Sequence, residues 1–233
     1  MSAAHTRDRR TPELERQRIL ASHNRFWRPT DLTGPPSTVR HLLAALTHQG
    51  ELRHVRRGLY WRGTRTPLGM SPPPIPELLR ELAPGPGVGP AGLTAANALR
   101  LSTQIPRSTE IAVPHRPPSA GGALRFVSRA SRAERVAAEL TPTEVALLEV
   151  LEAWERVVEV PPDDAWARMT AMLTTGAARP DRLTRAGRTE PGTVRARLKA
   201  LLRASGHPEL AGRVPAPDRR TAVLATRSLP AAA

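Results

Sequence analysis

Residues 37–63, STVRHLLAALTHQGELRHVRRGLYWRG, decide the expected fold of the N-terminal part of the chain. Apolar residues recur at the spacing of one buried helix face, at Val39, Leu42, Leu43 and Leu46. Gly50 follows as a natural helix stop. Two strand-like runs then flank Arg57 and Gly58, a pattern typical of a β-hairpin. The stretch therefore predicts an amphipathic helix followed by a hairpin.

The residues before this stretch predict two further helical segments. Thr11 and Pro12 are expected to cap and open a helix that continues to about Asn24. Residues 28–32 predict a single helical turn, and residues 33–36 a sharp break. Helix, short helix, turn, amphipathic helix and hairpin is the order of a winged helix-turn-helix. We expect such a DNA-binding domain over residues 1–68.

The predicted DNA contacts come from the amphipathic helix and from the hairpin. Short or hydrogen-bonding side chains at the start of a helix suit base edges in a major groove. Arginines on a hairpin suit phosphates or the minor groove, because the guanidinium presents a planar set of donors. The expected DNA-binding residues are Ser37, Thr38, Arg40, His41, Arg53, Arg56, Arg57 and Arg62. Two alternatives stay open: a merely solvated polar face, and a winged helix that docks on protein.

Charge and composition narrow the classes of partner. The 233 residues include 35 Lys+Arg against 21 Asp+Glu, a formal net charge of +14, and no cysteine. Residues 1–65 hold 13 basic and 5 acidic residues, residues 66–178 hold 10 and 12, and residues 179–233 hold 12 and 4. A uniform coding bias toward arginine would not leave the middle slightly acidic. The two basic blocks therefore indicate polyanionic partners, most simply nucleic acid.

The remainder of the chain predicts a mixed α/β domain that is rich in helices, so the expected fold class is α+β. A proline-rich linker is expected over residues 69–76, GMSPPPIP, because a triple proline continues neither a helix nor a central strand. The second domain is expected over residues 77–214. Residues 215–233 are expected to form a flexible Pro/Ala/Arg tail.

Within this second domain, several elements can be placed. Short strands are expected at residues 109–113 and 124–127, joined by the Pro/Gly-rich residues 114–123. Thr141 to Glu144 fits a capping box that opens a strong helix. The acidic residues of that helix, at positions 144, 149, 152 and 155, are expected to form a solvated face. Asp163 and Asp164 are expected at a helix start, which explains their charge better than a metal does.

Catalytic and membrane signals are missing from the sequence. Gly85, Gly87 and Gly89 have neither P-loop nor dinucleotide-binding spacing. His41 and His48 are seven residues apart, which is not the spacing of a metal-binding pair. We find no nucleophile elbow, and we expect no enzymatic activity, no metal and no cofactor. With no signal peptide or membrane span in view, we expect a soluble cytoplasmic protein.

The last helix is expected over residues 193–203 and belongs to the second basic block. The candidate second basic surface consists of Arg182, Arg185, Arg195, Lys199 and Arg203. It could extend a DNA footprint, contact RNA or an acidic protein surface, or be a solvated face. Charge does not separate these alternatives.

Four stretches in a fixed order resemble the AbiEi-type antitoxins of type IV toxin–antitoxin, or abortive-infection, systems. They are Gly58-Leu59-Tyr60, AANALRLSTQIP at 95–106, TEIAV at 109–113 and LTPTEVALLEVL at 140–151. The resemblance covers roughly residues 10–205. It implies a winged-helix domain that binds inverted repeats in its own promoter and represses the operon. It also implies a C-terminal domain that counteracts a nucleotidyltransferase-like toxin, often without a stable complex. The Arg179–Arg203 region is then the candidate neutralising surface.

Overall fold

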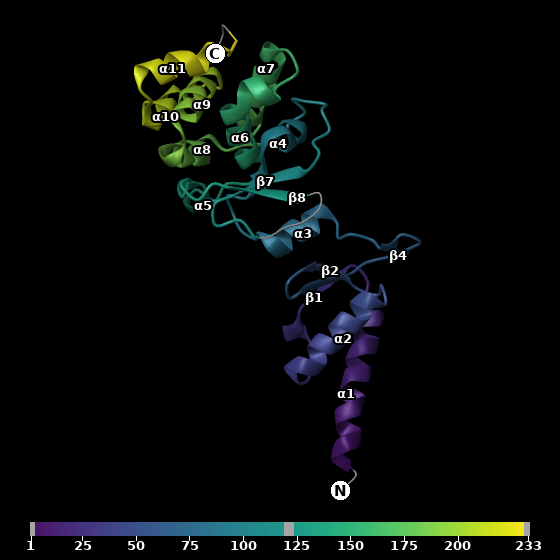
Figure 1. Cartoon of the computed structure of the whole chain (residues 1–233). Helices are drawn as coiled ribbons and strands as arrows, with labels where there is room; N and C mark the ends of the chain where they lie inside the picture. The colour runs from purple at the N-terminus through teal and green to yellow at the C-terminus, as the bar shows by residue number, and fades with distance from the viewer. Residues whose placement is uncertain (1–2, 119–123, 231–233) are drawn as a thin grey trace. The chain divides into compact units, whose positions relative to one another are not determined.

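The computed structural model describes residues 3–118 and 124–230, with side chains from Thr11 onward. The chain forms two compact units: the N-terminal unit ends at Glu81 and the C-terminal unit begins at Leu82 (Figure 1). The expected α+β class is confirmed. The division lies after the predicted linker. Residues 69–76 themselves contain a strand and the start of a helix.

The N-terminal unit begins with a long helix and continues into a small sheet. Its main elements are α1 (Ala3–Leu20), β1 (Arg25–Trp27), the 3-10 turn η1 (Pro29–Asp31), α2 (Pro36–His48), β2 (Arg53–Arg56) and β3 (Leu59–Arg62). A second hairpin, β4 (Arg65–Thr66) and β5 (Gly69–Met70), precedes α3 (Ile75–Leu82). α1 starts well before the predicted Thr11, so Pro12 lies inside the helix.

The three-stranded sheet of this unit is antiparallel in the order β1-β3-β2. The central strand β3 pairs Trp61 with Phe26 on one side and Tyr60 with His54 on the other. The core formed against it includes Ile19, Trp27, Leu32, Val39, Leu43, Leu46 and Leu52. The predicted apolar face of α2 is confirmed in this core, with Leu42 only half-buried at its edge. Burial of these side chains fixes which face of α2 is left in solvent.

The C-terminal unit contains a second small sheet and a cluster of helices. Its first elements are β6 (Gly89–Pro90), α4 (Gly92–Ala98), β7 (Thr109–Val113), β8 (Leu124–Ser128) and α5 (Glu134–Ala137). The helices that follow are α6 (Pro142–Val157), α7 (Pro162–Thr174), α8 (Pro180–Ala186), α9 (Gly192–Ala204), α10 (Pro208–Arg213) and α11 (Arg219–Thr226), with the 3-10 turn η2 (Gly187–Thr189) before α9. The sheet order is β6-β7-β8, with β7 and β8 parallel. Part of the connection between β7 and β8, residues 119–123, lies outside the described residues.

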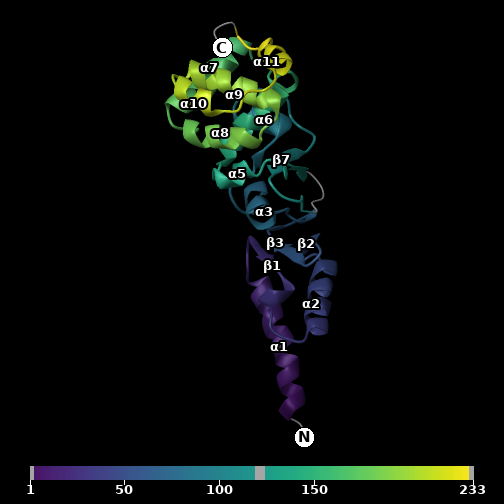
Figure 2. The same ribbon diagram turned by 90° about the vertical axis from the view of Figure 1, so that its left-hand side faces the viewer.

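Helix α6 is the centre of the C-terminal unit and is buried along most of its length (Figure 2). The predicted capping box is confirmed: the Glu144 amide donates to the Thr141 hydroxyl at 3.3 Å, and the Thr141 amide donates to the Glu144 carboxylate at 2.8 Å. Gly89 passes so close to this helix start that a Cβ atom would lie 2.7 Å from Cβ of Val145. Close packing, and not ligand binding, therefore accounts for that glycine.

Two expectations for this unit are wrong. Glu144 and Glu149 are almost fully buried, so the acidic side of α6 is not a solvated face. The predicted flexible tail contains α11, whose Ala225 is buried, and Leu229 beyond it is buried as well. The largest apolar residues of α11, Val223 and Leu224, are exposed, so no buried apolar face marks this helix in the sequence. The last residues, 231–233, lie outside the described part of the chain.

Candidate nucleic-acid interface

Helix α2 presents a polar face to solvent at its N-terminal end. Val39, Leu43 and Leu46 anchor the opposite face in the core, so Ser37, Arg40 and His41 are exposed and Thr38 is half-buried. The Arg40 Nε donates to the Pro36 carbonyl at 3.2 Å. Within the described residues, its two terminal nitrogens make no hydrogen bond. This bond fixes the root of the guanidinium and leaves its outer donors available to a ligand.

The hairpin after α2 carries the second set of predicted contacts. Its turn lies at Arg57 and Gly58, where Gly58 has a φ of +72° that a side chain would disfavour. Arg57 is exposed at this turn and Arg56 is half-buried. Arg53 is exposed at the other end of β2, where one terminal nitrogen donates to the Met70 carbonyl at 3.2 Å. Arg57 is therefore the most accessible cation of the hairpin tip.

Arg62 is the one predicted DNA contact that the structure makes unavailable. Its side chain is only 11% exposed and forms an ion pair with Glu51 at 3.4 Å. It also donates to the Leu20 carbonyl at 3.4 Å, where α1 ends. Sequence alternation could not reveal this burial, because β3 is the central strand and Trp61 is buried beside Arg62. Arg62 joins elements of the fold and cannot reach a phosphate.

The second basic surface is less free than its charge indicates. Arg182 donates to the Glu139 carbonyl at 2.6 Å, and Arg185 donates to the Ala137 carbonyl at 3.4 Å. Arg195 is half-buried, and Arg203 is exposed. Two of these arginines, Arg182 and Arg185, are therefore bonded to backbone carbonyls of the C-terminal unit.

Lys199 has a structural role. Its Nζ donates to the carbonyls of Ala211 at 2.9 Å and Val214 at 2.8 Å, at the end of α10. Desolvation, followed by repulsion from Arg203, lowers the pKa of Lys199 below its ordinary value. A cation at a helix C-terminus is favoured by the helix dipole. The amine of Lys199 therefore closes the end of α10 and does not face a partner.

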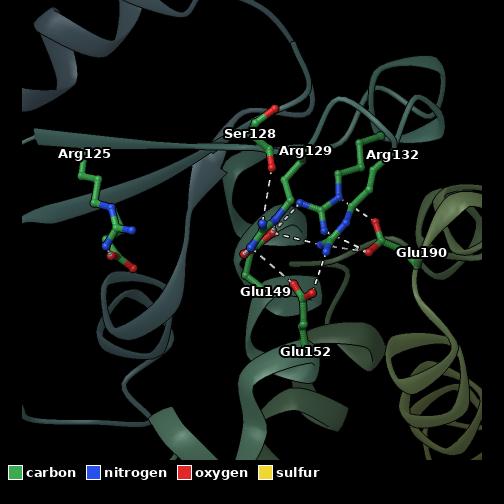
Figure 3. A network of polar contacts seen from close by, with 9 residues as sticks. Arg125, Ser128, Arg129, Arg132, Glu149, Glu152 and Glu190 are labelled. Carbon is green, nitrogen blue, oxygen red and sulfur yellow. Dashed lines mark hydrogen bonds and ion pairs between the residues drawn. The ribbon is translucent and has the colours of Figure 1, made fainter. Parts of the chain in front are cut away.

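A buried ionic network in the C-terminal unit was missed in the sequence (Figure 3). Glu149 on α6 accepts from Arg129 at 2.7 Å and from Arg135 at 2.7 Å. Arg135 also donates to Glu190 at 2.6 Å, and Arg132 donates to Glu152 at 2.6 Å. The members are three cations and three anions: Arg129, Arg132, Arg135, Glu149, Glu152 and Glu190. Their charges balance. The network joins the chain after β8 and helix α5 to α6 and to the chain before α9.

Glu149 illustrates how the network sets ionisation. Burial opposes the charged form, but the hydrogen bond from Arg129 and the field of Arg135 outweigh it and lower the pKa of Glu149. The signal that could have revealed the network is spacing. Arg129, Arg132 and Arg135 recur every three residues, and Glu149 and Glu152 are also three apart. Arginines and glutamates that recur at the same spacing indicate ion pairs between the two segments, and not a solvated acidic face.

Two other features are absent from the described residues. No group of three or more His, Cys, Asp or Glu side chains is placed to hold a metal ion there. Across residues 3–118 and 124–230, no helix is both long enough and apolar enough to cross a membrane.

Comparisons with known proteins give a distant structural likeness. No family model matches the chain, and no curated protein matches it. The crystal structure of the RV2827C protein from Mycobacterium tuberculosis is similar, with a TM-score of 0.42 and 17% sequence identity. The match covers 81% of this chain and 75% of that protein.

Proposed function

We propose that the N-terminal unit is a winged helix-turn-helix that binds duplex DNA in a sequence-specific way. The observation that carries the proposal is the exposed N-terminal face of α2, followed along the chain by a hairpin with Arg57 at its tip. On that face, the outer donors of Arg40 have no partner among the described residues. In this arrangement α2 reads base edges in the major groove. The hairpin adds sequence-independent contacts to phosphates or the minor groove.

We further propose that the chain is the repressor and antitoxin of a type IV toxin–antitoxin system. In this role it represses its own operon through inverted repeats and counteracts a nucleotidyltransferase-like toxin. This proposal rests on the resemblance to AbiEi-type antitoxins. A nucleotidyltransferase gene beside the gene for this chain would support it.

The deciding experiment is a binding titration of the full chain against its own upstream DNA and against a scrambled duplex of equal length. Both titrations are repeated at several salt concentrations, because phosphate contacts make all DNA binding salt-dependent. We expect a clear preference for the upstream duplex that persists at moderate salt. Equal affinity for both duplexes would reject specific repression and favour a winged helix that docks on protein.

A further inference from the structure

An open groove runs between α9 and α11 of the C-terminal unit, with a volume of about 640 Å³. Ala196, Ala200 and Ala204 line it from α9 at a spacing of four residues, so they share one face of that helix. Ala196 and Ala200 are only 6% and 7% exposed, whereas Ala204 is exposed. Val223 lines it from α11 and is 61% exposed. The lined part of α9 is about 12 Å long at a rise of roughly 1.5 Å per residue. The groove therefore has the length of about two helical turns.

The groove combines apolar walls with a cationic border. Arg203 lines it, is exposed and forms no ion pair among the described residues. Lys199 contributes only its aliphatic stem, since its amine is bonded to the end of α10. Residues 192–227 contain eight basic and two acidic residues, and Asp218, one of those two, caps α11. Of the basic residues, Arg197 is buried and paired with Glu155. The exposed cations are Arg203, Arg213, Arg219, Arg220 and Arg227, so they outnumber the two acidic residues of this segment.

We propose that this groove binds an acidic amphipathic helix of a partner protein. A helix lays apolar residues at i, i+3, i+4 and i+7 into such a groove, where Ala204 and Val223 offer exposed apolar surface. Acidic residues on the flanks of that helix would meet Arg203 and the other cations. The inference goes beyond the proposed DNA binding and does not depend on it.

Two other occupants fit the groove less well. A nucleic acid would bring phosphates against walls of alanine, valine and proline, with one free cation, Arg203, among the lining residues. A second copy of the chain would place the same basic surface opposite itself, which like-charge repulsion disfavours. An acidic helix satisfies both the apolar walls and the positive border.

The test uses a displayed library of peptides with apolar residues at helical spacing and variable acidic, basic or neutral residues elsewhere. The full chain is the bait. We expect the enriched peptides to be acidic. Their affinity, measured by fluorescence anisotropy, should fall at least roughly tenfold for Val223→Asp and for Arg203→Glu.

Matched controls lie on the same helix. Leu224 is 56% exposed and does not line the groove, so Leu224→Asp should leave the affinity of the peptides within about twofold. Arg220→Glu is the charge control, since Arg220 is exposed and also lies outside the lining. Circular dichroism and thermal unfolding verify that each variant is folded.

Several outcomes would overturn the inference. A library without binders, enriched peptides that are neutral or basic, or equal losses for Val223→Asp and Leu224→Asp would each reject it. Weaker DNA binding by Val223→Asp would assign the groove to nucleic acid instead. A change in the oligomeric state of that variant would assign it to a second copy. None of these outcomes depends on whether α2 binds DNA.

Discussion

The carboxylate of Glu149 is buried and forms ion pairs with Arg129 and Arg135. Glu149→Gln leaves Arg129 and Arg135 without their shared anion in a buried site, which costs about 3–5 kcal/mol of unfolding free energy. Urea unfolding, followed by the indole N–H signals of Trp154 and Trp166, measures this cost within the C-terminal unit. The control Glu110→Gln removes the partner of the 68% exposed Arg125 and should cost below about 1 kcal/mol. Equal costs would contradict the assigned role of the network.

The same residue predicts a dependence on pH. Because the folded state lowers the pKa of Glu149 below its ordinary value of 4.5, ionised Glu149 stabilises the fold above that pH. This contribution is lost as the pH falls from 4.5 toward the folded pKa. Urea unfolding at a series of pH values should show this loss in the wild type and a smaller loss in Glu149→Gln. Parallel pH profiles would assign the acid sensitivity to other carboxylates.

Arg40 tests the proposed reading of bases. If its free terminal nitrogens bond one guanine, Arg40→Ala reduces the discrimination between upstream and scrambled DNA by about 1–3 kcal/mol. Competition titrations with the two duplexes measure this difference directly. A variant that loses affinity equally for both would identify Arg40 as a phosphate contact.

Individual elements differ in how well they can be predicted from the sequence. α2 and the start of α6 were predictable because an apolar period and a capping box are local signals. Arg62 and Glu149 were not, because their burial depends on residues distant in the chain: Arg62 donates to the Leu20 carbonyl, and Arg129 and Arg135 donate to Glu149. α11 could not be predicted because it is short and packs mainly against α9, a contact that the local sequence does not show.

The β2–β3 hairpin predicts an effect on non-specific binding. Replacing both Arg56 and Arg57 by alanine should weaken the affinity for every duplex and reduce the salt slope by about one per lost phosphate contact. The control is Arg65→Ala on the neighbouring strand β4, which removes an exposed arginine paired with Glu51. Affinities for the scrambled duplex across a salt series give the slope. An unchanged slope would remove the hairpin tip from the interface.

Removal of α11 is expected to lower the free energy of unfolding of the C-terminal unit. Ending the chain after Pro217 removes the Ala225 carbonyl that accepts from Arg197 at 2.8 Å and the Ser228 carbonyl that accepts from the Trp154 indole at 3.2 Å. Each buried donor left unbonded costs about 1–3 kcal/mol. The free energy of unfolding should fall accordingly, with Trp154 as the reporter. A truncated chain of unchanged stability would restore the expectation of a flexible tail.

At the scale of the whole molecule, two units imply two unfolding events. Trp27 and Trp61 report on the N-terminal unit, whereas Trp154 and Trp166 report on the C-terminal unit. Upstream DNA at about 100 times its Kd should raise the free energy of unfolding of the N-terminal unit by about 2.7 kcal/mol. The unfolding of the C-terminal unit, followed by Trp154 and Trp166, should not change. Equal stabilisation of both pairs would show that the units are coupled, and stabilisation of the second pair alone would place the DNA site there.

Lys199 has a chemical consequence, because it is the only lysine among the 233 residues. Amine-acylating reagents modify an uncharged, accessible amine, and this one is held by two carbonyls at the end of α10. Its acylation therefore requires both hydrogen bonds to the end of α10 to break, which is a local opening. The rate of modification, read by mass spectrometry at a single site, would report that opening without any introduced label. Lys199 is therefore a built-in chemical probe of local opening in the C-terminal unit.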